Sequence, residues 1–157
     1  MPGQDFYWDP VVRVGYYQDH EIAIEGEHSL RIHSDNRLRV ITVTGSTALP
    51  AGHRWRVTGW VRAKGTMNPQ VYYSLRSYDD DSRGSGVLVP TGATREGWEQ
   101  RAASFIAPSR MVLTLNLINR QGTGDCWFDG FELEDLGEVG RLLTENGVGL
   151  SLIHISE

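Results

Sequence analysis

The stretch Gly122-Thr-Gly-Asp-Cys-Trp-Phe-Asp-Gly-Phe-Glu-Leu133 reads as a glycine-rich turn that leads into a β-strand. Side chains alternate between two faces of a strand, so the pattern predicts that Trp127, Asp129, Phe131 and Leu133 share one face. A carboxylate among three apolar side chains costs free energy unless it is hydrogen-bonded or bound to a cation. Calcium is the usual cation when backbone carbonyls can supply its other ligands. The stretch therefore predicts either a calcium ligand or an amide-bonded carboxylate at Asp129.

A second segment, Glu25-Gly-Glu-His-Ser-Leu-Arg-Ile32, also reads as a turn that runs directly into an alternating strand. Much of the remaining chain consists of short alternating or β-branched runs, which predict further strands. The predicted strands span residues 29–33, 38–44, 53–63, 70–78, 87–89, 98–106 and 111–119. The polar run Asp79–Gly86 predicts a loop. Strands at this spacing, separated by Gly and Pro, predict an antiparallel sandwich or barrel.

Together the two segments resemble the noncatalytic carbohydrate-binding modules that have a galactose-binding-like jelly-roll fold. In that family a G-x-x-S-L-R-I strand lies near the start, and a W-F-D-D-V-x-L strand closes the sandwich. The matching residues here are Gly26, Ser29, Leu30, Arg31 and Ile32, followed by Trp127, Phe128, Asp129, Phe131 and Leu133. Gly130 stands where the family has a second Asp, and Phe131 stands in place of Val. The resemblance spans most of Ile22 to Leu136.

The resemblance implies an all-β fold, an antiparallel two-sheet β-sandwich of the jelly-roll type. It also implies a structural Ca²⁺ that joins the first turn to the last strand, with Asp129, Glu25 and the Gly26 carbonyl as its ligands. The implied function is to bind a polysaccharide or oligosaccharide and so to target a larger, covalently linked secreted enzyme to its glycan. The implied location is extracellular.

Alternation within the predicted strands separates the core face from an outward face. The core face is predicted to carry Val57, Val61, Leu75, Phe105, Leu113 and Leu117. The outward face carries Trp60, Arg62, Tyr72, Arg76, Tyr78 and Asn116. Aromatic rings offer flat apolar surfaces to the C–H face of a sugar, and Arg and Asn donate to hydroxyls or carboxylates. We therefore expect these six residues to line a concave glycan groove, with packing of the aromatic rings beneath loops as the alternative.

A second aromatic set lies near the start of the chain, at Trp8, Tyr16 and Tyr17. We expect it on loops at the sandwich edge, where it would form a competing glycan site. The alternative to glycan binding is a structural or protein-interaction β-sandwich of a multidomain surface protein. A catalytic jelly roll is a third possibility, and it would require His and Tyr side chains that converge in one cleft.

Composition restricts the classes of partner and of chemistry. The chain has 157 residues, a length suited to one domain, and a formal net charge of −5, which argues against a nucleic-acid groove. No segment approaches transmembrane length, so we expect no membrane partner, and we expect a monomer. The single cysteine, Cys126, cannot form an internal disulfide. The sequence has no H-E-x-x-H, G-x-S-x-G or P-loop motif, and we expect no enzymatic activity.

The sequence predicts three segments. Residues 1–136 are expected to form the sandwich, and 137–149 a linker or the start of a further domain. The last segment, Leu150–Glu157, resembles a translated sequencing adapter, and we expect it to be a non-native tail of a metagenomic fragment.

Overall fold

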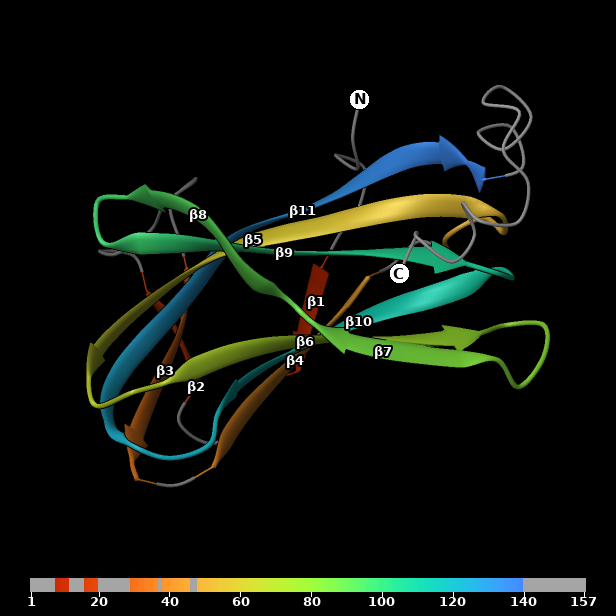
Figure 1. Cartoon of the computed structure of the whole chain (residues 1–157). Coiled ribbons are helices and arrows are strands. Elements are labelled where there is room, and N and C mark those ends of the chain that lie inside the picture. The colour runs from red at the N-terminus through yellow and green to blue at the C-terminus, as the bar shows by residue number, and fades with distance from the viewer. Residues whose placement is uncertain (1–7, 12–15, 20–28, 37, 46–47, 140–157) are drawn as a thin grey trace.

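The computed structural model describes residues 8–11, 16–19, 29–36, 38–45 and 48–139 (Figure 1). Its elements are β1 (Trp8–Val11), β2 (Tyr16–Asp19), β3 (Ser29–Asp35), β4 (Arg39–Gly45), β5 (His53–Gly65), β6 (Pro69–Ser77), β7 (Arg83–Val87), β8 (Val89–Arg95), β9 (Trp98–Ala107), β10 (Met111–Asn119) and β11 (Thr123–Glu138). They form a five-stranded sheet in the order β1-β4-β10-β6-β7 and a six-stranded sheet in the order β2-β3-β11-β5-β9-β8. All pairings between these strands are antiparallel, so the predicted two-sheet β-sandwich is confirmed.

The core lies between the two sheets and is built from the side chains that point inward at alternate positions along the strands. Leu113, Leu115 and Leu117 of β10 are completely buried, and Val57 and Val61 of β5 face them from the other sheet. The six predicted core residues are all buried, and the predicted alternation in the strands of 53–63, 70–78 and 111–119 is confirmed. Among the ranges that the structure describes, no helix has the length and apolar character needed to cross a membrane.

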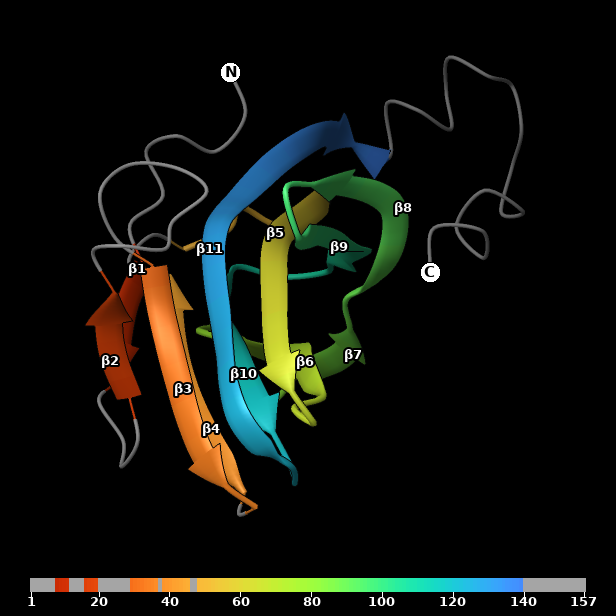
Figure 2. The same cartoon turned by 90° about the vertical axis from the view of Figure 1, so that its left-hand side faces the viewer.

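The strand β11 departs from the prediction because it contains a β-bulge. Figure 2 shows β11 as a long, curved strand between β3 and β5. Its pairing with β5 shifts register between Asp129 and Glu132, around Gly130, whose φ of 65° lies in the left-handed region. The extra residue exchanges the two faces, so Phe128 before the bulge and Leu133 after it both reach the core.

The prediction that Trp127, Asp129, Phe131 and Leu133 share a face is therefore wrong. Trp127 and Asp129 lie on the outer face, in register with Arg62 and Trp60, whereas Phe131 and Leu133 pack on the core. Phe131 fills the space beside Gly59, where a Cβ atom would collide with its ring. The bulge thus supplies a large core side chain at a position where β5 has none.

The chain crosses from one sheet to the other between β7 and β8, at Leu88 (Figure 1). Leu88 is buried, and its N–H donates to the carbonyl of Val71 over 2.9 Å. The predicted loop of residues 79–86 is thus a short turn followed by β7, and the predicted strand 87–89 is the crossing point. The inward positions of β7 are Gly84 and Gly86, which leave room for Leu75 and for the Tyr73 ring.

Candidate functional site

The structure does not bring the six predicted glycan-binding residues onto one surface. Trp60 and Arg62 belong to β5 and point outward from the six-stranded sheet. The other four lie on the outer side of the five-stranded sheet or at the end of β6: Tyr72, Arg76, Tyr78 and Asn116. Since the core separates the two outer faces, the six residues cannot line a single groove.

Two of these four residues, Arg76 and Tyr78, line a groove on the outer face of the five-stranded sheet, with a volume of about 790 Å³. Ligand pockets for small molecules and sugars commonly have volumes of roughly 300–1,000 Å³, so this groove is large enough for sugar residues. Its lining comes from β4, β6, β7 and β10, and from the turn after β6: Thr42, Thr44, Gly45, Ser74, Leu75, Arg76, Tyr78, Arg83, Gly84, Ser85, Val112 and Thr114. We call it the sheet groove.

The floor of the sheet groove contains a row of hydroxyl groups that crosses four strands. Thr44 of β4 is in register with Thr114 of β10, which is in register with Ser74 of β6 and through it with Ser85 of β7. Partners in register on one face lie side by side. The Thr44 and Thr114 hydroxyl oxygens are 3.5 Å apart. Each hydroxyl both donates and accepts hydrogen bonds, which suits it to the hydroxyls of a sugar.

The next row along the sheet adds an amide and an aromatic ring. Thr42, Asn116, Tyr72 and Val87 are in register across the same four strands. The Thr42 hydroxyl donates to Asn116 Oδ1 over 3.2 Å, and the Tyr72 hydroxyl donates to Gln70 Oε1 over 2.5 Å. These bonds fix the orientation of the amide and the ring beside the groove.

Tyr78 stands at one end of the sheet groove and is 56% exposed. Its N–H donates to the Arg110 carbonyl over 2.9 Å, and the Arg110 guanidinium carbon lies 5.3 Å from the ring centroid. One guanidinium thus supports the ring through a cation–π contact. The exposure of the ring argues against the alternative expectation that it packs beneath a loop.

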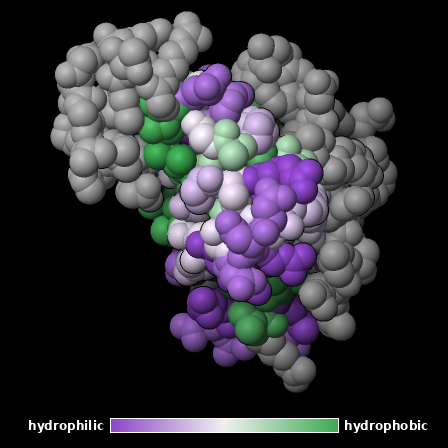
Figure 3. Space-filling view, turned by 90° about the vertical axis from the view of Figure 1, so that its right-hand side faces the viewer, coloured by the Kyte–Doolittle hydropathy of each residue, from purple (hydrophilic) through white to green (hydrophobic). Residues whose placement is uncertain are grey.

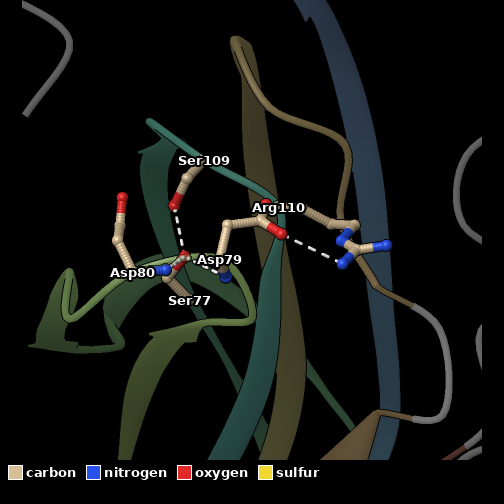
Figure 4. A network of polar contacts seen from close by, with 5 residues as sticks. All are labelled: Ser77, Asp79, Asp80, Ser109 and Arg110. Carbon is tan, nitrogen blue, oxygen red and sulfur yellow. Dashed lines mark hydrogen bonds and ion pairs between the residues drawn. The ribbon is translucent and has the colours of Figure 1, made fainter.

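A polar network fixes the turn that carries Tyr78, as Figure 4 shows. The Ser77 hydroxyl oxygen accepts from the Ser109 hydroxyl over 2.7 Å, from the Asp79 N–H over 3.0 Å and from the Asp80 N–H over 3.2 Å. Arg110 donates to Asp79 Oδ1 over 3.0 Å. The network joins the β6–β7 turn to the β9–β10 turn, at an end of the sandwich where hydrophilic side chains predominate on the described surface (Figure 3).

The outer face of the six-stranded sheet is occupied by a different arrangement. Trp127 is buried, and the guanidinium carbons of Arg31 and Arg62 each lie 5.9 Å from its ring centroid. Arg31 is also paired with Asp125 over 2.9 Å. Arg62 therefore contacts an aromatic side chain of its own sheet, and Trp60 beside it is partly buried.

Two further predictions concern residues that the structure describes only in part. Trp8 lies on β1 and Tyr16 and Tyr17 on β2, so they belong to edge strands of the two sheets and not to loops. Of the expected calcium ligands, Asp129 accepts a hydrogen bond from the Gly130 N–H over 2.8 Å, while Glu25 and Gly26 lie outside the described residues. No three His, Cys, Asp or Glu residues gather as metal ligands within the described ranges.

The predicted segment boundaries fall close to the end of the described chain. The strand β11 continues past residue 136 to Glu138, and the Val139 N–H donates to the Gly52 carbonyl over 2.8 Å. The remainder of the predicted linker, and all of Leu150–Glu157, lie outside the described residues.

Several residues of the sheet groove were not predicted. The sequence placed Arg83 and Ser85 in a loop, and it gave no reason to select Thr44, Ser74 or Thr114. The alternation of Thr42 and Thr44 with buried Ile41 and Val43 is a signal for an outward face. Register between strands that are distant in sequence was needed to join them in one row.

No protein-family model matches the sequence, and no curated protein matches it. Solved structures with a similar fold include the CBM22-1 and GH10 modules of the endo-1,4-beta-D-xylanase 10B of Clostridium thermocellum complexed with xylohexaose. The TM-score is 0.61 and the identity 16%, over 83% of this chain, which spans 26% of the length of that xylanase chain.

Two further similar structures are single modules. The second family 16 carbohydrate-binding module has a TM-score of 0.55 and 16% identity, covering 76% of this chain and 84% of its own. A family 61 module in complex with β-1,4-galactotriose has a TM-score of 0.54 and 13% identity, covering 85% of this chain and 94% of its own. This chain therefore has the jelly-roll β-sandwich fold of carbohydrate-binding modules.

Proposed function

We propose that this protein is a noncatalytic carbohydrate-binding module that holds a polysaccharide in the sheet groove. The observation that carries the proposal is the row of hydroxyls on the groove floor, with the exposed ring of Tyr78 fixed at its end. Hydroxyls match the donors and acceptors of a sugar, and the ring matches its apolar C–H face. Structures of the same fold that contain xylohexaose and β-1,4-galactotriose support a carbohydrate as the ligand.

The role of such a module is passive. An open groove buries little area, and sugar hydroxyls exchange bonds to water for bonds to protein at a small net gain, so each contact is weak. A covalently linked catalytic domain would nevertheless gain a high local concentration of its polymer. We propose that the chain targets a secreted enzyme to glycan in this way, outside the cell.

The proposal is tested by affinity gel electrophoresis of the full chain on plant, algal and bacterial polysaccharides, beside Tyr78→Ala, Tyr78→Phe and Trp60→Ala. Tyr78 is 56% exposed, and covering that part of the ring would contribute about 1–1.5 kcal/mol, roughly a five- to tenfold change in affinity. Tyr78→Ala should lose this factor, whereas Tyr78→Phe, which keeps the ring, should bind almost normally. Trp60 lies on the outer face of the six-stranded sheet, so Trp60→Ala should leave retardation unchanged.

A different pattern would overturn the proposal. Binding that is abolished by Trp60→Ala and unaffected by Tyr78→Ala would transfer the site to the six-stranded sheet. Absence of retardation on every polysaccharide would favour the structural β-sandwich.

We further propose that Asp129 contributes to a structural calcium site with Glu25 and the Gly26 carbonyl. Support comes from the position of Asp129 at the bulge of β11, where its carboxylate is partly buried and adjacent to Gly130. Carboxylate and carbonyl oxygens are the ligands that calcium prefers. Calcium should raise the melting temperature of the full chain above its value in EDTA, and Asp129→Asn should reduce that increase. Equal melting temperatures with calcium and EDTA would refute the site.

A further inference from the structure

Two arginines lie side by side on neighbouring strands of the sheet groove. Arg76 of β6 and Arg83 of β7 are direct partners in register, both are exposed, and both line the groove. Like charges directly opposite each other on one face of a sheet are destabilising. The other partner of Arg76 in register, on β10, is the uncharged Val112. The sheet itself therefore offers neither guanidinium a neutralising neighbour.

The described acidic side chains of the turn between β6 and β7 form no ion pair with these two arginines. Asp79 is bonded to Arg110 over 3.0 Å, and Asp80 Oδ1 accepts from the Ser82 N–H over 2.8 Å. Asp81 lies exposed in the turn between β6 and β7. Among the described residues, no ion pair joins Arg76 or Arg83 to any carboxylate. The groove therefore has two guanidiniums available beside its row of hydroxyls.

We infer that the sheet groove selects an anionic glycan, one whose sugars carry carboxylate or sulfate groups. A guanidinium binds such an oxyanion through two parallel hydrogen bonds, and two guanidiniums side by side can hold one anion between them. The adjacent hydroxyls of Ser74 and Ser85 then face the hydroxyls of the same sugar. The inference rests on the proposed glycan-binding function and specifies its ligand.

Because the chain has a negative net charge, its selection of an anionic glycan has to come from contacts within the groove. At a formal net charge of −5 the whole molecule repels a polyanion, so binding depends on the arginine pair and not on a general basic surface. Since the Debye length is about 8 Å at physiological ionic strength, distant carboxylates are screened there while contacts within the groove persist.

The test is affinity electrophoresis of the full chain at physiological ionic strength on matched polymers. Polygalacturonate is compared with its fully methyl-esterified form, which has the same backbone without charge, and dextran sulfate with dextran. The substitutions are Arg76→Gln and Arg83→Gln, with Arg95→Gln as the control, since Arg95 is an exposed arginine on β8 of the other sheet. The melting temperature of each variant verifies that it is folded.

We expect a charged polymer to retard the protein more than its neutral partner does, and the two polymer pairs distinguish carboxylate from sulfate. Removal of either guanidinium should weaken that binding roughly five- to tenfold, while Arg95→Gln leaves it unchanged. Equal retardation on charged and neutral partners, or equal effects of all three substitutions, would overturn the inference and leave glycan binding intact. Absence of retardation on these polymers and on the wider polysaccharide panel would overturn both proposals.

Discussion

The Ser77 hydroxyl offers the sharpest test of how the groove is built. Ser77 is 9% exposed and accepts three hydrogen bonds, from the Ser109 hydroxyl and from the N–H groups of Asp79 and Asp80 (Figure 4). Each bond contributes about 0.5–1.5 kcal/mol net. In a variant without the hydroxyl, water at the exposed turn can accept some of the hydrogen bonds that Ser77 accepts in the native protein. Ser77→Ala should therefore lower the free energy of unfolding by about 1–2 kcal/mol, near the lower limit of the summed contributions of the three bonds.

The matched control is Ser109→Ala, which removes one of the three bonds and should cost about 0.5–1 kcal/mol. Urea unfolding followed by tryptophan fluorescence measures both variants, and Ser77→Ala should shift the midpoint by roughly 0.5–1 M for an m-value near 2 kcal/mol/M. The double variant should cost less than the sum of the two, because both substitutions delete the same Ser77–Ser109 bond. Ser77→Ala should also weaken glycan binding, since Tyr78 follows it in the chain.

Two results would refute this reasoning. If Ser77→Ala cost no more than Ser109→Ala, the two backbone bonds would not contribute to stability. If glycan affinity were unchanged in Ser77→Ala, the network would not position Tyr78.

Three other predictions concern the core and the His53–Asp135 pair of the six-stranded sheet. Gly59→Ala should destabilise the protein by about 1–3 kcal/mol in urea unfolding, because its new methyl group would collide with the Phe131 ring; unchanged stability would contradict the packing. Burial, with a smaller contribution from Asp125, raises the pKa of the Cys126 thiol to about 12, so iodoacetamide at pH 8 should label unfolded protein and spare the folded protein. Burial tends to raise the pKa of Asp135. Two hydrogen bonds, from His53 and from the Gly137 N–H, act together with the charge of His53 against this effect and hold that pKa below 3.8. The stability from this carboxylate is thus present above pH 3.8 and lost as pH falls through its lowered pKa, so Asp135→Asn should flatten the acid side of the stability curve; an unchanged curve would contradict this.

Local alternation was sufficient to predict the core. Leu113, Leu115 and Leu117 alternate with polar or β-branched residues in the sequence, and they are completely buried in the structure. The same rule separated Val57 and Val61 from Trp60 and Arg62 on β5. A period of two is set by the backbone itself, so it survives without knowledge of the partner strands.

Alternation failed to predict the buried face where a β-bulge inserts an extra residue and where a strand has no hydrophobic side chains at its inward positions. The bulge at Gly130 inserts one residue into β11 and thereby exchanges the faces of Asp129 and Phe131. In β7 the inward positions are Gly84 and Gly86, so no hydrophobic period marks the strand. The side chains that fill this space, such as Tyr73, come from β6.

The candidate site was predicted only in part because membership of a sheet is a property of the topology. Trp60 and Tyr72 both point away from the core, and the sequence cannot tell that they do so on opposite sheets. The pairing of Arg76 with Arg83 likewise depends on the β6–β7 register. Outward residues can therefore be predicted from sequence, whereas their grouping into a groove requires the fold.

The central claim is that glycan lies on the outer face of the five-stranded sheet. The most direct test is a ¹H–¹⁵N NMR titration of the full chain with xylohexaose, β-1,4-galactotriose and trigalacturonate. We predict that the largest chemical-shift changes occur at the backbone amides of Thr44, Ser74, Tyr78 and Thr114, with little change along β5. Changes concentrated at Trp60, Arg62 and Trp127 would contradict the account and place the ligand on the six-stranded sheet.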